Sequence, residues 1–444
     1  MIKNYFAALF CLVSTALLAQ PKLNAPYTRF GIGNIAPGYF AVQSGQGGLT
    51  TAFADPFHLN LANPASFAYL RTTTLETGLF AQNSQFQSGS SNLNVWSGNL
   101  AYFALGFTLR SPINEALDRK RSPWRHGMGF SLTPYSVVGY DTESIDTLAS
   151  VGIVKSRFEG NGGTYRLAWH GASRYKNTSL GATLGWMFGT SRYENTTSFA
   201  DSLPTFENNF YDRYSVGGLV WKLGVQHDIV LKRLENDKEV PTKWITLGAT
   251  AESQHRLNAS SDIVRLRSRG RSITTGQYID PDTIEFSSGV DRSVTLPGSF
   301  SFGIEYVNVD KFKIGAQTTF ENWKNYKNEV RPETLNNTLS VAAGVEFIPD
   351  YASYNRYMKR VRYRFGGYYR QDPRKVANQD LTDLGITFGL GFPLILPRQQ
   401  TSFINFGVEA GRFGANSPIS ETYVRMTLGF TFNDNSWFFK RRFE

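Results

Sequence analysis

Cysteine is almost absent from this chain, with Cys11 alone among 444 residues. It lies in an apolar N-terminal stretch that is typical of a secretion signal, with Lys3 before the apolar core and Ala19 before a predicted cleavage site at Gln20. Residues 1–19 are therefore expected to be removed, which leaves a mature chain without thiols or disulfides. A lipid anchor on Cys11 is the alternative, but the bulky Phe10 precedes it, so we interpret Cys11 as part of the signal.

Long apolar runs are also missing. After the signal, no segment has 18 consecutive apolar residues, which excludes a transmembrane helix in the mature chain. Only 18% of the residues are charged, while 14% are aromatic and 41 are glycine, a composition that suits strands and turns better than disorder. The formal net charge of +10 is compatible with contact with phosphate-bearing lipids, although solvated loops and a polar lumen account for most of these charges.

Signatures of catalysis are lacking as well. No metal-ligand spacing, phosphate-binding glycine loop or nucleotide fingerprint occurs, and the GNGGTY stretch from Gly160 opens a strand and marks a turn. The five histidines are scattered; His170 is expected to point inward from a strand, but the sequence places no serine or acid beside it. We therefore predict no enzyme activity, no catalytic residues, no cofactor and no metal. The basic residues are spread over many loops and strands, and no nucleic-acid-binding motif is recognised, which argues against nucleic-acid binding.

Strict alternation dominates the rest of the chain. In residues 424–432, Val424, Met426, Leu428 and Phe430 alternate with polar or small residues, and similar segments recur from Thr72 onward with turns between them. A soluble sandwich also alternates. Long strands that reach the C-terminus, an export signal and the lack of disulfides favour an all-β protein of the outer membrane, a transmembrane antiparallel barrel with a lipid face and a lumen face.

The alternating segments can be counted. Fourteen are expected, at residues 72–86, 94–110, 124–138, 164–175, 178–192, 212–229, 243–254, 297–308, 311–323, 338–347, 361–370, 384–392, 402–411 and 422–432. An even number suits a bacterial barrel. The barrel is thus expected over residues 72–432, with a periplasmic tail at 433–444. With both termini in the periplasm, the short links 176–177 and 309–310 fall on that side, and the longest link, 255–296, lies outside the cell.

The long link carries a basic repeat. Arg265, Arg267, Arg269 and Arg271 alternate, so an extended backbone would display four guanidinium groups on one side. Such a row predicts an extracellular anion site for lipopolysaccharide phosphates or an acidic partner. A solvated loop or a strand extension is the alternative interpretation.

Residues 20–71 lack the alternating pattern. They are rich in glycine and small residues, and Asn63-Pro64 favours a turn. A barrel of about fourteen strands has a wide lumen that a compact segment can fill. We therefore expect residues 20–71 to form a hatch, or plug, inside the barrel, with Phe67 and Tyr69 packing toward the wall.

The same segment carries a resemblance to a known family, in the order Gly45, Gly47, Gly48, Asp55, Asn63, Pro64 and Ala65. This order resembles the N-terminal hatch of FadL-type outer-membrane proteins, including the related branch of the type IX secretion protein PorV. Similar stretches follow in GFSLTPYSVVGY, GNGGTYRLAWHGA and ETYVRMTLGFTF. The resemblance implies a fourteen-stranded barrel with a luminal hatch that takes up hydrophobic compounds, or, in the PorV-type branch, one that works with protein partners.

Charged residues predicted on the inner face of the barrel are compatible with two different functions. Alternation turns Arg362, Arg364, Glu409 and Arg425 into the lumen, where they can bind the carboxylate of an amphipathic ligand or clamp the plug through ion pairs. The first hypothesis is a FadL-like transporter of hydrophobic or amphipathic small molecules across the outer membrane. The alternative is a plugged accessory barrel, a subunit or shuttle of a secretion or outer-membrane assembly complex. Expected partners are outer-membrane lipid and lipopolysaccharide, a hydrophobic ligand, or proteins of such a complex.

Overall fold

The computed structural model describes the greater part of the chain, namely residues 25–89, 91–110, 122–148, 152–199, 206–235, 237, 240–270, 274, 277–396 and 400–434. The predicted signal peptide, residues 435–444 of the predicted tail, and Arg271 lie outside the described residues. Within the described ranges, none of the helices has both the length and the apolar character that crossing a membrane requires.

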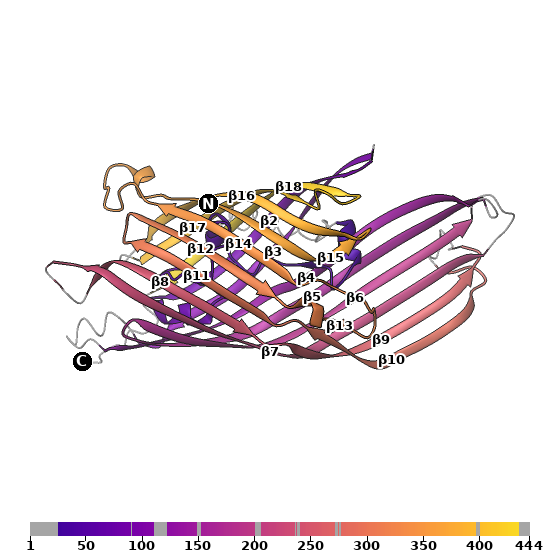
Figure 1. The fold of residues 1–444 in the computed structure, drawn as a ribbon, viewed down its shortest axis with the longest axis horizontal. Coiled ribbons are helices and arrows are strands. Elements are labelled where there is room, and N and C mark those ends of the chain that lie inside the picture. Colours follow the sequence, from indigo (N-terminus) through magenta and orange to yellow (C-terminus); the bar gives the residue numbers. More distant parts are fainter. Residues whose placement is uncertain are drawn as a thin grey trace, which may run out of the picture.

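A closed antiparallel barrel of fourteen strands forms the body of the molecule (Figure 1). Each strand pairs with the next, and the last pairs with the first. The strands are β2 (Thr73–Ser88), β3 (Ser91–Thr108), β4 (Trp124–Leu148), β5 (Gly152–Tyr175), β6 (Thr178–Phe199), β7 (Glu207–Arg233), β8 (Pro241–Glu252), β11 (Ser299–Asn308), β12 (Phe312–Glu321), β14 (Thr338–Phe347), β15 (Arg362–Val376), β16 (Gln379–Leu396), β17 (Gln400–Phe413) and β18 (Ser420–Asp434). The predicted fold class is confirmed, and each of the fourteen predicted segments overlaps one of these strands.

The alternating pattern separates the two faces of the wall. Leu184, Trp186 and Ile386 are exposed on the outside, whereas Thr183 and Thr387 are buried inside. Because successive strand residues point to opposite faces, a two-residue period in the sequence becomes an apolar outer face and a polar, small-residue inner face. This division is what an outer-membrane barrel requires.

The two ends of the barrel differ. At one end, which we call the turn end, β5 and β6 are joined by Lys176 and Asn177, and β11 and β12 by residues 309–311. At the other, the extended end, β4 to β7 run well beyond their predicted limits. β9 (His255–Ser268) and β10 (Asp282–Leu296) form a hairpin there, where an irregular link was expected. β7 pairs with β9 through its first half and with β8 through its second half.

The strands beyond the barrel mouth therefore form a one-sided wall. It consists of the upper parts of β4, β5, β6 and β7 together with β9 and β10, and we call it the flange. Figure 1 shows its strands projecting past the ends of β14 to β18. Smaller elements complete the fold: η1 (Pro26–Arg29), β1 (Asn34–Ile35), α2 (Ala41–Ser44), η2 (Pro64–Tyr69), η3 (Trp323–Asn325), β13 (Lys327–Asn328) and η4 (Tyr357–Lys359).

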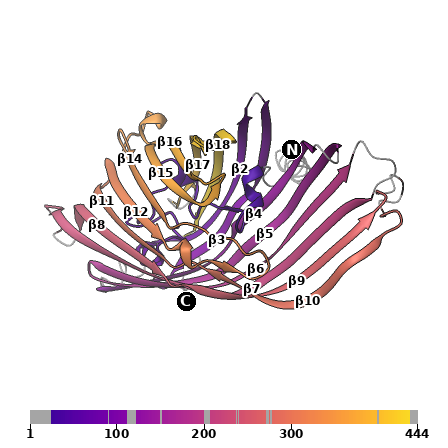
Figure 2. The same ribbon diagram turned by 45° about the vertical axis from the view of Figure 1, so that its right-hand side comes forward.

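The wall has one seam. β3 and β4 pair through Phe103–Thr108 and Gly127–Leu132 and then separate toward the extended end, which can be followed in Figure 2. The N-terminal segment, residues 25–72, enters here. Ala25 donates its backbone N–H to the Gly139 carbonyl of β4 at 2.9 Å, and β1 pairs with β4 farther down. The described chain thus runs from Ala25, toward the extended end, down to β2, which starts at the turn end, where Thr73 pairs with Asp434 of β18. Both chain termini lie outside the described residues, so their place at the turn end stays a prediction.

Candidate functional site: the N-terminal segment and the barrel lumen

The N-terminal segment touches the inner face of the wall around almost its whole circumference. Ten inward glycines lie against its residues 41–68, and we call them the glycine ring: Gly127, Gly181, Gly224, Gly248, Gly303, Gly344, Gly366, Gly389, Gly407 and Gly429. A Cβ on Gly344 would stand 2.5 Å from the Gln46 carbonyl oxygen, and one on Gly181 would overlap the Ala65 nitrogen. Only glycine leaves room for such close backbone approach, so the ring accommodates a segment packed directly against the strands.

The glycines that directly follow α2 have a conformational role. Gly47 and Gly48 have φ values of 71° and 81°, a region that other residues rarely adopt. They reverse the chain after α2 and aim the Gly47 N–H at the Thr387 hydroxyl of β16, 2.8 Å away. Gly45 caps α2 and packs against Gly389. The three glycines of the predicted hatch motif therefore form one turn against the wall.

The Asn63-Pro64-Ala65 triplet starts η2. The Asn63 carboxamide oxygen accepts the Ala65 N–H at 3.1 Å, and Pro64 occupies the first position of the helix, where no N–H is needed. The Asn63 amide group also donates to the Thr51 carbonyl at 2.6 Å and to the Val225 carbonyl of β7 at 3.3 Å. The triplet thus joins two parts of the segment to each other and to the wall.

Asp55 joins the segment to a buried cluster of charges. Its Oδ2 lies 2.9 Å from Lys313 Nζ of β12 and 3.0 Å from Arg362 Nη1 of β15. Burial alone would raise the pKa of the Asp55 carboxyl, but Lys313 and Arg362 hold that pKa well below its usual range. The aspartate therefore stays ionised between two cations that would otherwise repel each other.

A second carboxylate balances the same cluster. Glu346 of β14 lies 2.7 Å from Arg364 Nε, and Arg364 Nη1 donates to the Asn405 side chain at 3.1 Å. Arg364 is fully buried. A buried ion pair is weak support for stability by itself, yet removing one partner costs about 3–5 kcal/mol because the other charge is left unpaired. The two predicted lumen arginines are thus paired inside the barrel, one of them with the N-terminal segment.

The other predicted lumen charges also meet the segment or its neighbours. Glu409 of β17 accepts from the Ser44 hydroxyl at 2.7 Å and from the Tyr39 hydroxyl at 3.2 Å. Arg425 is the cross-strand neighbour of Glu409 and donates to the Gln82 side chain at 2.8 Å. Three of the four predicted lumen charges are buried; Arg425 is partly exposed. The inner surface of this part of the barrel is polar and occupied.

His170 belongs to the same packing. Its ring is fully buried, stacks on Phe67 of η2 with centroids 4.9 Å apart, and forms hydrogen bonds with Ser131 and Thr183 at 2.9 Å. Neither hydrogen-bond partner is an acid, so the group lacks the orienting carboxylate of a catalytic triad. Among the described residues there is also no group of three or more His, Cys, Asp or Glu that could hold a metal ion.

The start of the segment packs against the flange at the extended end. Ile32 packs into an apolar cluster with Tyr193 and Tyr214 of the flange and with Trp323 and Leu335 of the link between β12 and β14. Arg29 lies over the Phe158 ring, with 3.6 Å from its guanidinium carbon to the ring centroid. These contacts join the start of the segment to the flange and to the link between β12 and β14.

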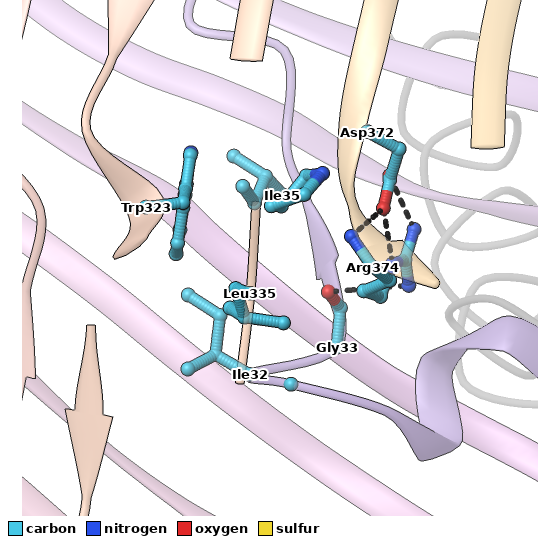
Figure 3. Close-up of a pocket in the computed structure, with 9 residues that line it drawn as sticks. Ile32, Gly33, Ile35, Trp323, Leu335, Asp372 and Arg374 are labelled. Atoms are coloured by element: carbon cyan, nitrogen blue, oxygen red, sulfur yellow. Dashed lines mark hydrogen bonds and ion pairs between the residues drawn. The ribbon is translucent and has the colours of Figure 1, made fainter. Parts of the chain in front are cut away.

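A small cavity remains at this mouth. Figure 3 shows Ile32 and Ile35 facing Trp323 across it, with Arg374 of β15 held by Asp372 at its side. Its volume is about 10 Å³. A single water needs about 10–15 Å³, so the cavity does not take a small organic molecule.

The predicted basic repeat lies on the flange, and its charges are largely compensated. Arg265 Nη2 lies 2.6 Å from Asp212, and Arg267 Nη2 lies 2.6 Å from Asp282. Arg269 Nε is 3.7 Å from Asp280. Each described arginine of the repeat therefore has an aspartate beside it, and the repeat is part of β9 and the residues directly after it.

Several residues that join the segment to the wall were not predicted. The Gln317 side chain of β12 accepts the Thr50 and Thr51 N–H groups at 2.8 and 2.9 Å, and Gln226 of β7 donates to the Thr51 carbonyl at 3.2 Å. Lys313 and Glu346 were missed as well. The sequence could have indicated them, because each of these side chains is a polar residue at an inward position of its strand.

The glycine ring can be tested within one strand. In β7, a side chain at Gly224 would overlap the Asn63 carboxamide, whereas a Cβ at Gly217 meets only the Trp186 ring at 3.7 Å. We expect Gly224→Leu to lower stability by about 1–3 kcal/mol through overpacking and to make the N-terminal segment sensitive to limited proteolysis in detergent. Gly217→Leu is the matched control and should leave both unchanged. Equal protease resistance of the two variants would contradict the packing described.

Comparison with known proteins places this geometry in context. The model of the BamG family matches residues 1–444, and no curated protein matches the chain. The toluene transporter TbuX of Ralstonia pickettii is 13% identical, with a TM-score of 0.54 over 90% of this chain and 99% of that one. The toluene transporter TodX of Pseudomonas putida is also 13% identical, with a TM-score of 0.53 over 91% and 100%. A Pseudomonas aeruginosa FadL homologue is 14% identical, with a TM-score of 0.52 over 90% of this chain and 99% of that one.

At these identities the likeness establishes the fold. The chain has the architecture of FadL-like outer-membrane barrels, as the sequence resemblance predicted, and its structural neighbours are transporters and channels.

Proposed function

The chain belongs to the BamG family, and from this membership and the filled lumen we propose that it works as a sealed accessory barrel in an outer-membrane assembly complex. The observation that carries the proposal is the close contact of residues 41–52 and 63–68 with the glycine ring. In this function residues 25–72 are a permanent plug, the extended end faces the cell exterior and the turn end faces the periplasm. The family name points in the same direction.

The chemistry of the plug contact supports a permanent role. Asp55 and Glu409 both contact partners across the boundary between plug and wall, and Asp55 is almost fully buried between two cations. Withdrawing the plug would leave Lys313 and Arg362 without this carboxylate, which is costly for buried charges. A gate that opens in every transport cycle would have to break these pairs each time.

Uptake of a hydrophobic compound is the second candidate. The fold shared with two toluene transporters and a FadL homologue favours it. A pocket of ligand size is what such a site needs, typically about 300–1,000 Å³ for a drug-sized ligand. The small cavity at the mouth, about 10 Å³, is far below this range. Because of the family membership and the close contact between plug and wall, we put the assembly function first.

An engineered disulfide separates the two candidates. At Gly407 the atom nearest an added Cβ is a side-chain atom, Ser44 Oγ at 2.8 Å, and the Ser44→Cys substitution replaces it with the bonded sulfur. The added Cβ would lie 3.3 Å from the Ser44 Cβ, close to the spacing of about 3.5–4.5 Å in disulfides. We expect the oxidised Ser44→Cys/Gly407→Cys variant to co-purify with the same outer-membrane proteins as the wild type and to sustain normal levels of assembled outer-membrane proteins in cells. A sealed barrel does not need to move its plug.

The controls use the absence of other thiols from the predicted mature chain. The two single-cysteine variants report any effect of the substitutions themselves, and a reductant reports any effect of the bond. A function lost on oxidation and recovered on reduction would reject the sealed-barrel proposal in favour of a moving plug.

A further inference from the structure

The flange is a sheet with two free edges. Its strands follow the order β4, β5, β6, β7, β9 and β10. β4 pairs with β3 only through Gly127–Leu132, and β10 pairs with β13 only at Val294 and Thr295. Above these points, among the described residues, the outer edge of β4 pairs only with the two residues of β1, and the outer edge of β10 has no strand partner. Unpaired strand edges are templates for the addition of another strand.

The chain already adds a strand to one of these edges. Asn34 and Ile35 of β1 pair with Val137 and Ser136 of β4, and the Ala36 N–H donates to the Tyr135 carbonyl at 2.8 Å. Farther up, the Gly139 carbonyl accepts the Ala25 N–H at 2.9 Å and the Thr28 hydroxyl at 3.0 Å. The lower part of the β4 edge is therefore occupied by the chain itself, and the upper part, residues 140–148, continues the same edge.

The upper β4 edge is regular. β4 pairs with β5 from Ser136 to Leu148 without a register shift. The backbone groups of Gly139 point to the free edge, and antiparallel strands alternate their hydrogen-bonding direction, so Asp141, Glu143 and Ile145 present their N–H and C=O groups there too. The β10 edge is different, because its register shifts twice, near Thr283 and again before Val290. Bulges of this kind are a common protection of edge strands.

The side chains at the β4 edge indicate the chemistry of a partner. Ile145 is 60% exposed. The paired strand tips, residues 141–148 and 152–159, carry four carboxylates and two cations. One of those cations, Arg157, already binds Asp141 at 2.8 Å and Glu159 at 2.6 Å. The edge therefore offers backbone hydrogen bonds, an apolar side chain and an excess of negative charge.

We propose that the free edge of β4, residues 140–148, binds an extended basic segment of a partner protein as an added strand. Strand addition takes affinity from main-chain hydrogen bonds and specificity from alternate side chains. The inference rests on the proposed function, because it assigns a docking place to the assembly complex. The proposed occupant of the edge is a segment of a partner protein, and the alternative occupant is the chain's own residues 20–24.

A labelled peptide tests this edge directly. The probe is a fluorescent ten-residue peptide that alternates lysine and valine, and fluorescence anisotropy measures its binding to the purified full-length barrel in detergent. We expect binding to the wild type and at least about tenfold weaker binding to Ile145→Pro, because proline removes an edge donor and its ring blocks approach. The same peptide with alternate amides N-methylated should not bind.

Asp291→Pro on β10 is the matched control. The neighbouring Ser293 exchanges hydrogen bonds with Glu329 on the outer side of β10, so the Asp291 N–H, two residues away, also points to a free edge. Neither proline removes a hydrogen bond to a neighbouring strand of the flange, and Asp291→Pro should bind the peptide as the wild type does. Replacement of Glu143 and Asp146 by lysine should weaken binding, because the edge would then repel the basic peptide.

The outcomes separate this inference from the proposed function. Equal binding to the wild type and Ile145→Pro would overturn the docking edge, as would no binding to the wild type. Binding that requires removal of residues 20–24 would assign the edge to the chain's own N-terminus and also overturn the proposal. Peptide binding at the edge with no partner proteins in purified native complexes would sustain the docking edge and reject the assembly function.

Discussion

Barrels that lack residues 21–60 are expected to conduct ions in planar bilayers, whereas the complete chain is expected to stay closed. The deletion removes α2, the turn at Gly47 and Gly48, Thr51 and Asp55, which together contact strands of the wall from β8 to β18. The ring of strands itself is held by pairings between wall strands alone. A barrel of this size leaves a water-filled lumen when nothing occupies it.

The current should also have a preferred sign. Without Asp55, the cluster in the lumen keeps Lys313, Arg362 and Arg364 against Glu346 and Glu305, so anions should pass more easily than cations. Reversal potentials in a salt gradient measure this preference. A control deletion of residues 263–288, the end of the β9 and β10 hairpin, should remain closed. Silent barrels after removal of residues 21–60, or an open complete chain, would contradict a lumen blocked by the N-terminal segment.

The wall of the barrel was predictable because its environment repeats every two residues. Lipid outside and a filled lumen inside impose alternation on each strand, as in residues 424–432, so the fourteen segments could be located from the sequence. The flange lies beyond this environment. Residues 139–148 carry Asp141, Glu143 and Asp146 among few apolar residues, and no apolar period marks them as a strand. Their pairing with β5 is fixed by the neighbouring strand instead of by a local pattern.

The lumen was predictable only in part, for a related reason. The turn at Gly47 and Gly48 and the cap at Asn63 are local features, so the residue types alone predict them. The partners of the segment are not local. Asp55 and Lys313 are 258 residues apart in the chain, and nothing near either residue identifies the other. The glycine ring was visible as glycines on inward positions, but only the segment in place explains why they recur.

Loss of the last strand is expected to prevent membrane insertion altogether. β18 pairs with β17 from Phe403 to Phe413 and with β2 from Thr73 to Gln87. Deleting residues 422–444 would leave two long edges unpaired in lipid, where each unsatisfied backbone group costs several kcal/mol. Refolding from urea into liposomes, followed by gel electrophoresis with and without heating, should give no heat-sensitive folded band for this truncation.

A shorter truncation separates strand pairing from the tail. Removing residues 435–444 leaves the paired residues of β18 intact, since its pairing with β2 ends at Asp434. If closure of the hydrogen-bonded ring is what permits insertion, this variant should refold into liposomes like the complete chain, while the longer truncation fails. Failure of both would assign insertion to the aromatic and basic residues of the tail, and success of both would mean that β2 and β17 can satisfy each other across the gap. Either result would contradict the fourteen-stranded closure as the condition for crossing the membrane.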